Sequence, residues 1–193
     1  MVDLKSNKTS FNSTFHKNEE LPNSFLVNFN EIKKEGKEFV RISIDGTQIG
    51  DVIDDNSYEK DFYRYHDVFH YTFATMLNWS PCTRAMLGRK RKSIPIIDEY
   101  EDGARATITE EAISLILFNE AKRTNLFENR KVSKTILKII KQMTEPFEVR
   151  VKTEKEWEKA ILKGYSLFKK LVANRGGEIE FNLDNRNAIY LNN

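Results

Sequence analysis

The sequence is poor in several residue types, and each shortage excludes a class of protein. It contains one cysteine, Cys82, which excludes an internal disulfide and favours a reducing compartment. No apolar run approaches the ~20 residues that a membrane-spanning helix needs. The N-terminus lacks the apolar segment of a secretion signal. We therefore expect a cytoplasmic protein without a membrane partner.

The two signs of charge are nearly balanced, with 31 Lys and Arg against 29 Asp and Glu and a net charge of +2. This excess is too small to indicate nucleic-acid binding by itself. A chain of 193 residues fits one domain, with or without a short tail. Residues 1–20 are rich in Ser, Asn, Thr and Lys, so we expect a flexible tail there and a single domain over 21–193. The sequence leaves the oligomeric state open.

Both ends of this domain show the alternation of apolar and polar residues that is typical of β-hairpins. Residues 25–29 and 39–44 alternate on either side of a polar turn that contains glycine. Residues 178–183 and 188–191 flank the turn sequence DNRN in the same way.

Between the hairpins, apolar residues recur at the spacing of buried helices. The pattern predicts helices over 59–79, 104–123, about 133–143, and from Thr153 to about 174. Thr153 and Glu156 form a capping-box sequence at the start of the last helix. The fold class is therefore α+β, with about four helices packed with a small antiparallel sheet that the N- and C-terminal hairpins form.

The stretch RYHDVFHYTF, residues 64–73, places polar groups among residues that favour burial. Projected at 100° per residue, His66, Asp67 and His70 fall within one arc of ~100°, which continues into Ala74 and Leu77. A buried polar group without a partner costs about 1–3 kcal/mol, so these three side chains must find partners.

A second polar group interrupts the stripe of the helix over 104–123. Glu111 lies on the stripe formed by Ala104, Ile108, Leu115 and Phe118, and Glu110 points roughly 100° away. Glu101 joins this stripe if the helix begins early enough. A carboxylate on an apolar stripe is rarely tolerated unless it is paired or binds a cation.

Side by side, these two helices could form a metal-dependent catalytic site. The candidate catalytic residues are His66, Asp67, His70 and Glu111, and the candidate metal ligands are Asp67, His70, Glu101 and Glu111. A mixed set suits Mn, Fe or Zn and a carboxylate-dominated subset suits Mg, so we expect Mg or Mn rather than Zn.

A basic segment follows the first of these helices. The candidate phosphate-binding residues are Arg84, Arg89, Lys90 and Arg91, together with Arg105. They could hold phosphates while a metal polarises the phosphoryl group. The alternatives are that this run is a solvated face and that the His, Asp and Glu side chains only connect two helices.

Three stretches resemble the C-terminal region that accompanies MazG-type nucleotide pyrophosphohydrolase domains in some bacterial proteins. They are YRYHDVFHYTFATMLNWSPCTRAMLGRKRKS, DEYEDGARATITEEAISLILF and MTEPFEVRVKTEKEWEKAILKGY. Their most distinctive parts are His66-Asp67-x-x-His70, the run from Arg89 to Ser93, and Glu101-Asp102-Gly103-x-Arg105 with Glu110-Glu111. The resemblance covers about residues 22–190 and implies a MazG C-terminal-like domain standing alone, with a link to nucleotide metabolism or phage defence.

The chain departs from the catalytic pattern of MazG-type enzymes, which bind magnesium with an EExxE helix and an ExxD helix. Ser114 stands where the third acid of EExxE is required, and Glu120 is followed by Lys122 and Arg123. One hypothesis is a divergent metal-dependent hydrolase of a nucleotide or related phosphate ester. The alternative is a non-catalytic module that binds a nucleotide, a nucleic acid or a partner protein.

Overall fold

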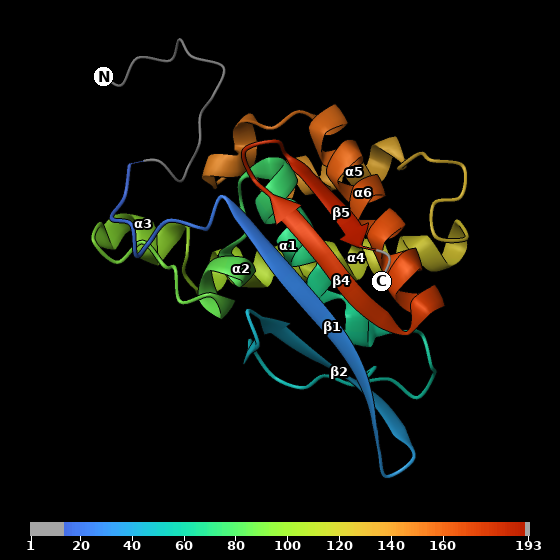
Figure 1. Ribbon diagram of the computed structural model, residues 1–193. Coiled ribbons are helices and arrows are strands. Elements are labelled where there is room, and N and C mark those ends of the chain that lie inside the picture. The colour runs from blue at the N-terminus through green and yellow to red at the C-terminus, as the bar shows by residue number, and fades with distance from the viewer. Residues whose placement is uncertain (1–13, 192–193) are drawn as a thin grey trace.

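A computed structural model describes residues 14–191, and it confirms the α+β class. A five-stranded antiparallel sheet in the order β3-β2-β1-β4-β5 lies against the helices. In Figure 1 the sheet crosses the front of the molecule, and α1, α4, α5 and α6 lie behind it.

The two terminal hairpins join to make this sheet, as the alternation predicts. The N-terminal hairpin consists of β1 (Ser24–Lys34) and β2 (Lys37–Ile44), extended by the short β3 (Thr47–Gln48). The C-terminal hairpin consists of β4 (Gly176–Asn182) and β5 (Asn187–Leu191). Strands β1 and β4 pair antiparallel, with Val27 opposite Ile179.

Four helices correspond to the predicted ones, and they are α1 (Asp67–Leu77), α4 (Ala104–Arg123), α5 (Lys134–Met143) and α6 (Glu154–Asn174). The capping box of Thr153 and Glu156 is formed. The short helices α2 (Pro81–Met86) and α3 (Pro95–Tyr100) were not predicted. Each begins with proline at its first position, where a backbone N–H would have no partner within the helix, so the missing N–H costs nothing. Pro81 therefore follows α1 and also begins α2. Short 3-10 turns, η1 (Tyr63–Tyr65) and η2 (Glu148–Val151), complete the helical elements.

The first long helix begins later than residue 59, where the sequence places it. Phe62 has φ 65° in the left-handed region, which interrupts an α-helix, and the turn η1 follows it. His66 therefore occupies the N-cap of α1, and Asp67 lies in its first turn.

Helix α1 is the central element of the core. All eleven of its residues are buried, which explains why its polar side chains have apolar neighbours. It packs closely on α6 because Gly164 has no side chain, and a Cβ there would lie 2.8 Å from the Phe69 ring. Trp79 and Trp157 are also buried in the core.

The structure describes residues 14–20 of the predicted tail, and these residues contact the rest of the molecule. Glu19 is buried and accepts a hydrogen bond from the Ser93 backbone at 2.7 Å. Residues 1–13 lie outside the described part of the chain, and the division into a tail and one domain stays a prediction. No helix within residues 14–191 is both long and apolar enough to cross a membrane.

Candidate functional site

The candidate site is built around one buried carboxylate, Glu110 on α4. Its Oε1 accepts hydrogen bonds from His70 Nδ1 at 2.9 Å and from Ser80 Oγ at 2.7 Å. Its Oε2 accepts the backbone N–H of Cys82 at 2.9 Å, in the first turn of α2. Glu110 thereby connects α1, α2 and α4, and it fixes which nitrogen of His70 carries a proton.

The other nitrogen of His70 is directed toward Glu111. His70 Nε2 lies 3.3 Å from Glu111 Oε1 and makes no hydrogen bond within the described part of the chain. Nδ1 donates to Glu110, so the ring can present a lone pair only at Nε2, after the proton that faces Glu111 has left that atom. This is the orientation that second-shell carboxylates give to metal-binding histidines.

His66 is oriented in the same way by a backbone group. Its Nδ1 lies 3.0 Å from the carbonyl oxygen of Tyr63, to which it donates, and its Nε2 lies 3.3 Å from Asp67 Oδ1. Tyr63 also stacks on the imidazole, with ring centroids 4.1 Å apart. Both imidazoles therefore have a fixed donor at Nδ1 and a carboxylate beside Nε2.

The environment sets different protonation preferences for these groups. Burial lowers the pKa of His66. Burial also disfavours the charged form of His70, but its neighbours Cys82 and Glu110 outweigh this and hold its pKa well above the ordinary value. Burial raises the pKa of the Cys82 thiol and keeps it protonated. Burial alone would raise the pKa of Glu111, but the His70 ring lowers it to about 2.

Two groups of side chains could hold a metal ion, because within each group the ligand atoms lie within 4.8 Å of one another. The first group is His66, Asp67 and His70, and the second is His70, Cys82 and Glu110. The second group fits a metal poorly, because Glu110 already accepts three hydrogen bonds and the thiol is protonated. The first group has two imidazoles and a carboxylate with Glu111 beside it, a donor set that suits a divalent transition ion.

A pocket of about 610 Å³ lies beside the first group, and His70 is not among its lining residues. His66, Asp67 and Glu111 line one side, and Asp51 and Asp54 line another. Neither lysine nor arginine is among its lining residues. The pocket is acidic, which favours cations over unaccompanied phosphates.

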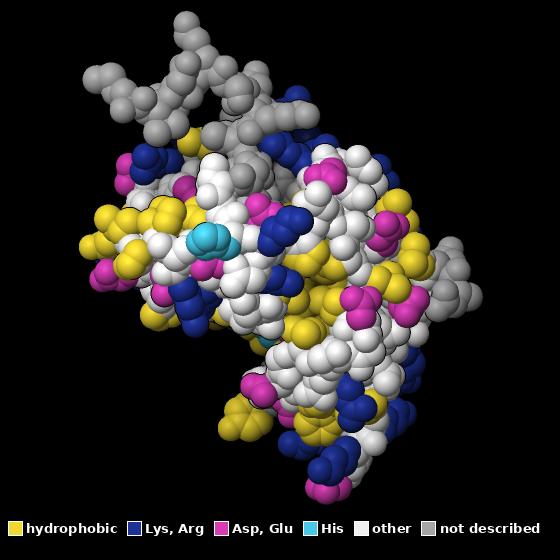
Figure 2. Space-filling model, turned by 60° about the vertical axis from the view of Figure 1, so that its left-hand side comes forward, with side chains coloured by type: hydrophobic (Ala, Val, Ile, Leu, Met, Phe, Trp, Pro, Cys, Tyr) yellow, Lys and Arg dark blue, Asp and Glu magenta, His cyan; other side chains and the backbone are white. Residues whose placement is uncertain are grey.

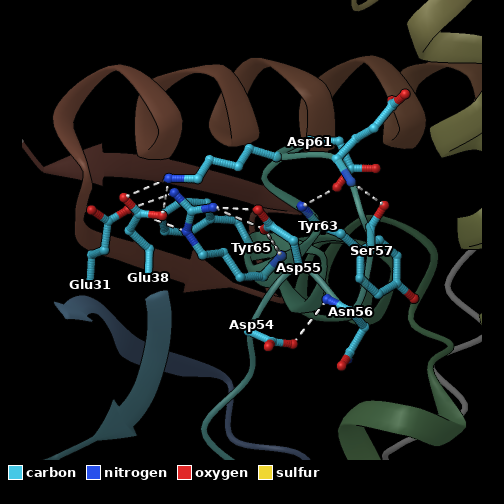
Figure 3. Close-up of polar contacts among 12 residues, drawn as sticks. Glu31, Glu38, Asp54, Asp55, Asn56, Ser57, Asp61, Tyr63 and Tyr65 are labelled. Atoms are coloured by element: carbon cyan, nitrogen blue, oxygen red, sulfur yellow. Dashed lines mark hydrogen bonds and ion pairs between the residues drawn. The ribbon is translucent and has the colours of Figure 1, made fainter. Parts of the chain in front are cut away.

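The loop that carries Asp51 and Asp54 is anchored by Arg64. This buried guanidinium pairs with Asp55 at 2.7 Å and with Glu31 of β1 at 3.0 Å. Tyr65 donates its hydroxyl hydrogen bond to Glu31 at 2.8 Å. Figure 3 shows Glu31, Asp55 and Tyr65 gathered in this network, which holds the loop against the sheet and gives the pocket a fixed wall.

Glu101, expected as a metal ligand, lies in a different cluster. Its carboxylate accepts the backbone N–H of Glu148 at 3.0 Å, at the start of η2, and neither group of potential metal ligands contains it. The helix α4 begins at Ala104, after Glu101, so the stripe that Glu101 was expected to extend does not reach it. Glu101 therefore belongs to a helix cap.

Two of the expected phosphate-binding residues, Arg84 and Arg91, point into the molecule. Arg91 pairs with the buried Asp102 at 2.6 Å and with Glu148 at 2.8 Å. Arg84 donates to the backbone oxygens of Glu19 at 2.8 Å and of Arg89 at 3.0 Å. Their guanidinium groups are bonded inside the molecule because Asp102 and these carbonyl oxygens need buried partners, so the structure does not present them for phosphates.

The remaining three basic candidates lie nearer the surface. Arg89 and Lys90 are half-buried, with Arg89 donating to the Lys17 carbonyl oxygen at 3.2 Å, and Arg105 is exposed. Figure 2 shows one face of the molecule, on which Lys and Arg side chains are interspersed with Asp and Glu. Their role in phosphate binding stays a prediction, as do the catalytic and metal-binding roles of His66, Asp67, His70 and Glu111.

The sequence pattern predicted the wrong buried face of α4. Ile108 and Leu115 are exposed, whereas Ala106, Glu110, Ile113 and Leu117 are buried. Two apolar stripes overlap in this helix, and the one that contains Glu110 faces the core. The sequence feature that indicates burial of Glu110 is its spacing from Ala106 and Ile113, which places all three on one face of the helix.

Comparison with known proteins identifies one family. The model of the family described as the MazG C-terminal domain matches residues 6–193. No curated protein and no solved structure matches the chain.

Proposed function

Since the chain belongs to the MazG C-terminal domain family, we propose that it is a metal-dependent hydrolase acting on a nucleotide or a related phosphate ester. The observation that supports this proposal is that Nδ1 of both His66 and His70 donates to a fixed acceptor while Nε2 of each ring faces a carboxylate. Asp67 and Glu111 lie beside these nitrogens at the rim of an open pocket. The Nδ1 bonds fix the orientation of both rings, and an ion would displace the proton that the raised pKa of His70 favours at Nε2.

The proposed cofactor is Mn²⁺ or Mg²⁺, and the two imidazoles favour Mn²⁺. A bound divalent ion would polarise a phosphoryl group and lower the pKa of a water molecule. The chain's own contribution is to fix the ligands: Glu110 holds the His70 ring, and the Tyr63 carbonyl holds the His66 ring. An acidic pocket without Lys or Arg can accept a phosphate ester only together with a cation, which agrees with a metal-dependent reaction.

We further propose nucleotide-pool control or phage defence as the setting of this activity. The test is a screen of nucleoside triphosphates, diphosphates and monophosphates for release of phosphate or pyrophosphate, with Mn²⁺, Mg²⁺ or Zn²⁺. We expect turnover with Mn²⁺ or Mg²⁺, a loss of at least about 100-fold in Asp67→Asn, and near wild-type rates in Lys138→Gln, at an exposed position of α5. Turnover that is absent with every nucleotide and metal, or equal in Asp67→Asn, would rule out this function.

One observation favours a second function, that of a non-catalytic binding module. The bonds from Glu110 to His70, Ser80 and Cys82 connect three helices and are sufficient to explain why these polar groups are buried. In that case the chain would bind a nucleotide, a nucleic acid or a partner protein without turnover. Thermal melting distinguishes the two, because a module of this kind is indifferent to Mn²⁺ and chelator, whereas the hydrolase is stabilised by the ion.

A further inference from the structure

A second pocket, of about 630 Å³, lies away from the acidic one and shares none of its lining residues. It is bounded by α6, by the segment between α4 and α5, and by the turn between β4 and β5. Its volume falls within the ~300–1,000 Å³ that is typical of small-molecule sites.

Five cationic side chains line this basic pocket: Arg130, Lys159, Lys163, Lys169 and Arg186. Neither Asp nor Glu is among its lining residues. None of the five makes an ion pair with any residue between 14 and 191. Cations that converge without acidic partners repel one another, and a polyanion would relieve that repulsion.

Helix α6 supplies most of this charge from one face. Lys159, Lys163 and Ser166 follow one another at four- and three-residue spacing, and Lys169 continues the row. The crowding affects Lys163, whose pKa is lowered by burial and by the charges of Lys170 and Lys159.

Apolar side chains form part of the lining of the basic pocket. Met76, Leu126, Phe127 and Leu162 line it beneath the cations, and Met76 and Phe127 are buried. An apolar floor under a cationic rim suits a ligand that has a flat organic group at one end and phosphates at the other.

One buried polar group of this pocket lacks a partner. Tyr165 lines the pocket and is 1 % exposed, and its hydroxyl makes no hydrogen bond in the described part of the chain. Its ring is fixed between Phe69 and Phe127, with centroids 4.7 and 4.8 Å away. A buried hydroxyl without an acceptor is costly, so a ligand oxygen would complete this site.

We propose that the basic pocket is a binding site for a nucleoside polyphosphate, with phosphates on the Lys and Arg rim and the nucleoside on the floor. The site is independent of the proposed metal centre. An extended nucleic-acid strand fits less well, because the cations surround a bounded pocket with an apolar floor and do not form a track across the surface.

The test is calorimetric titration of the full chain with ATP in EDTA, so that a metal-dependent site does not contribute. We expect one ATP per chain, with tripolyphosphate binding more weakly because it lacks the nucleoside. Lys159→Gln/Lys163→Gln should weaken ATP by at least about tenfold. The control is Lys138→Gln, an exposed lysine of α5 outside the pocket, which should change affinity less than twofold.

Tyr165→Phe tests the hydroxyl separately. It should weaken ATP about fivefold without lowering the melting temperature, since the hydroxyl has no partner to lose in the ligand-free protein. Absence of ATP binding, an equal loss in Lys138→Gln, or tight binding of a single-stranded oligonucleotide but not of ATP would overturn the proposal. Loss of ATP binding in Asp67→Asn with no loss in Lys159→Gln/Lys163→Gln would assign the nucleotide to the acidic pocket and also overturn it.

Discussion

At the scale of single residues, two neighbouring glutamates on α4 have opposite environments. We assign a structural role to the first, Glu110, and a role in the proposed metal site to the second, Glu111. Glu110 is fully buried and accepts three hydrogen bonds, whereas the Glu111 side chain is 43 % exposed and lines the acidic pocket. The sequence predicted that His66, Asp67, His70 and Glu111 would converge. It could not identify Glu110, because two apolar stripes overlap in α4 and only tertiary packing selects one of them.

Glu110→Gln should lower the free energy of unfolding by about 2–4 kcal/mol in metal-free buffer. The carboxylate accepts hydrogen bonds from His70, Ser80 and Cys82. The NH₂ group of glutamine cannot accept a hydrogen bond, so at least one of these buried donors would lose its partner. Glu111→Gln is the matched control and should cost less than about 1 kcal/mol. Urea unfolding in EDTA measures both, and equal losses in the two variants would refute this division of roles.

Arg91 has a structural role that its place in a basic run concealed. It pairs with Asp102, which is fully buried, and with Glu148 of η2. Arg91→Gln should therefore lower stability by about 3–5 kcal/mol, because it leaves a buried carboxylate without its charged partner.

Arg105→Gln is the control for this prediction, since Arg105 is exposed, and it should be neutral within about 0.5 kcal/mol. Thermal melting compares the two variants. An Arg91→Gln protein as stable as Arg105→Gln would show that Arg91 is the surface cation that the sequence alone indicates.

At the scale of elements, the long helices and both hairpins were predictable because each has a sustained period and clear end signals, such as the capping box at Thr153. Helices α2 and α3 were not, because six residues are too few to show a period. The start of α1 was also missed, since the left-handed backbone at Phe62 has no signature in the sequence. The most extensive contact between two helices, that of α1 with α6, depends on a glycine, Gly164.

Gly164→Ala should destabilise the protein by up to about 2 kcal/mol. Its Cβ would lie 2.8 Å from the buried Phe69 ring, and overpacking costs about 1–3 kcal/mol, which the better helix propensity of alanine offsets only in part. Ser166→Ala, at an exposed position of the same helix, is the control. Urea denaturation decides, and a Gly164→Ala protein more stable than wild type would show that α1 and α6 have room to separate.

At the scale of the whole molecule, two open pockets of opposite charge lie on one α+β framework. The net charge of the chain does not reveal these two pockets, because it does not show where the charged side chains lie. Arg84 and Arg91 are bonded inside the molecule, whereas the lysines of α6 line the basic pocket. The composition could predict neither pocket, since both are formed by segments far apart in the chain. The family resemblance, in contrast, was evident from the sequence and is confirmed over residues 6–193.

The central claim is that His66, Asp67, His70 and Glu111 hold one divalent ion. Titration with Mn²⁺, followed by electron paramagnetic resonance of the free ion, measures it most directly. We predict one Mn²⁺ per chain in the wild type and in Arg105→Gln, with affinity at least about tenfold weaker in the folded Glu111→Gln variant. No stoichiometric Mn²⁺ binding by the wild type, or wild-type affinity in Glu111→Gln, would contradict the account.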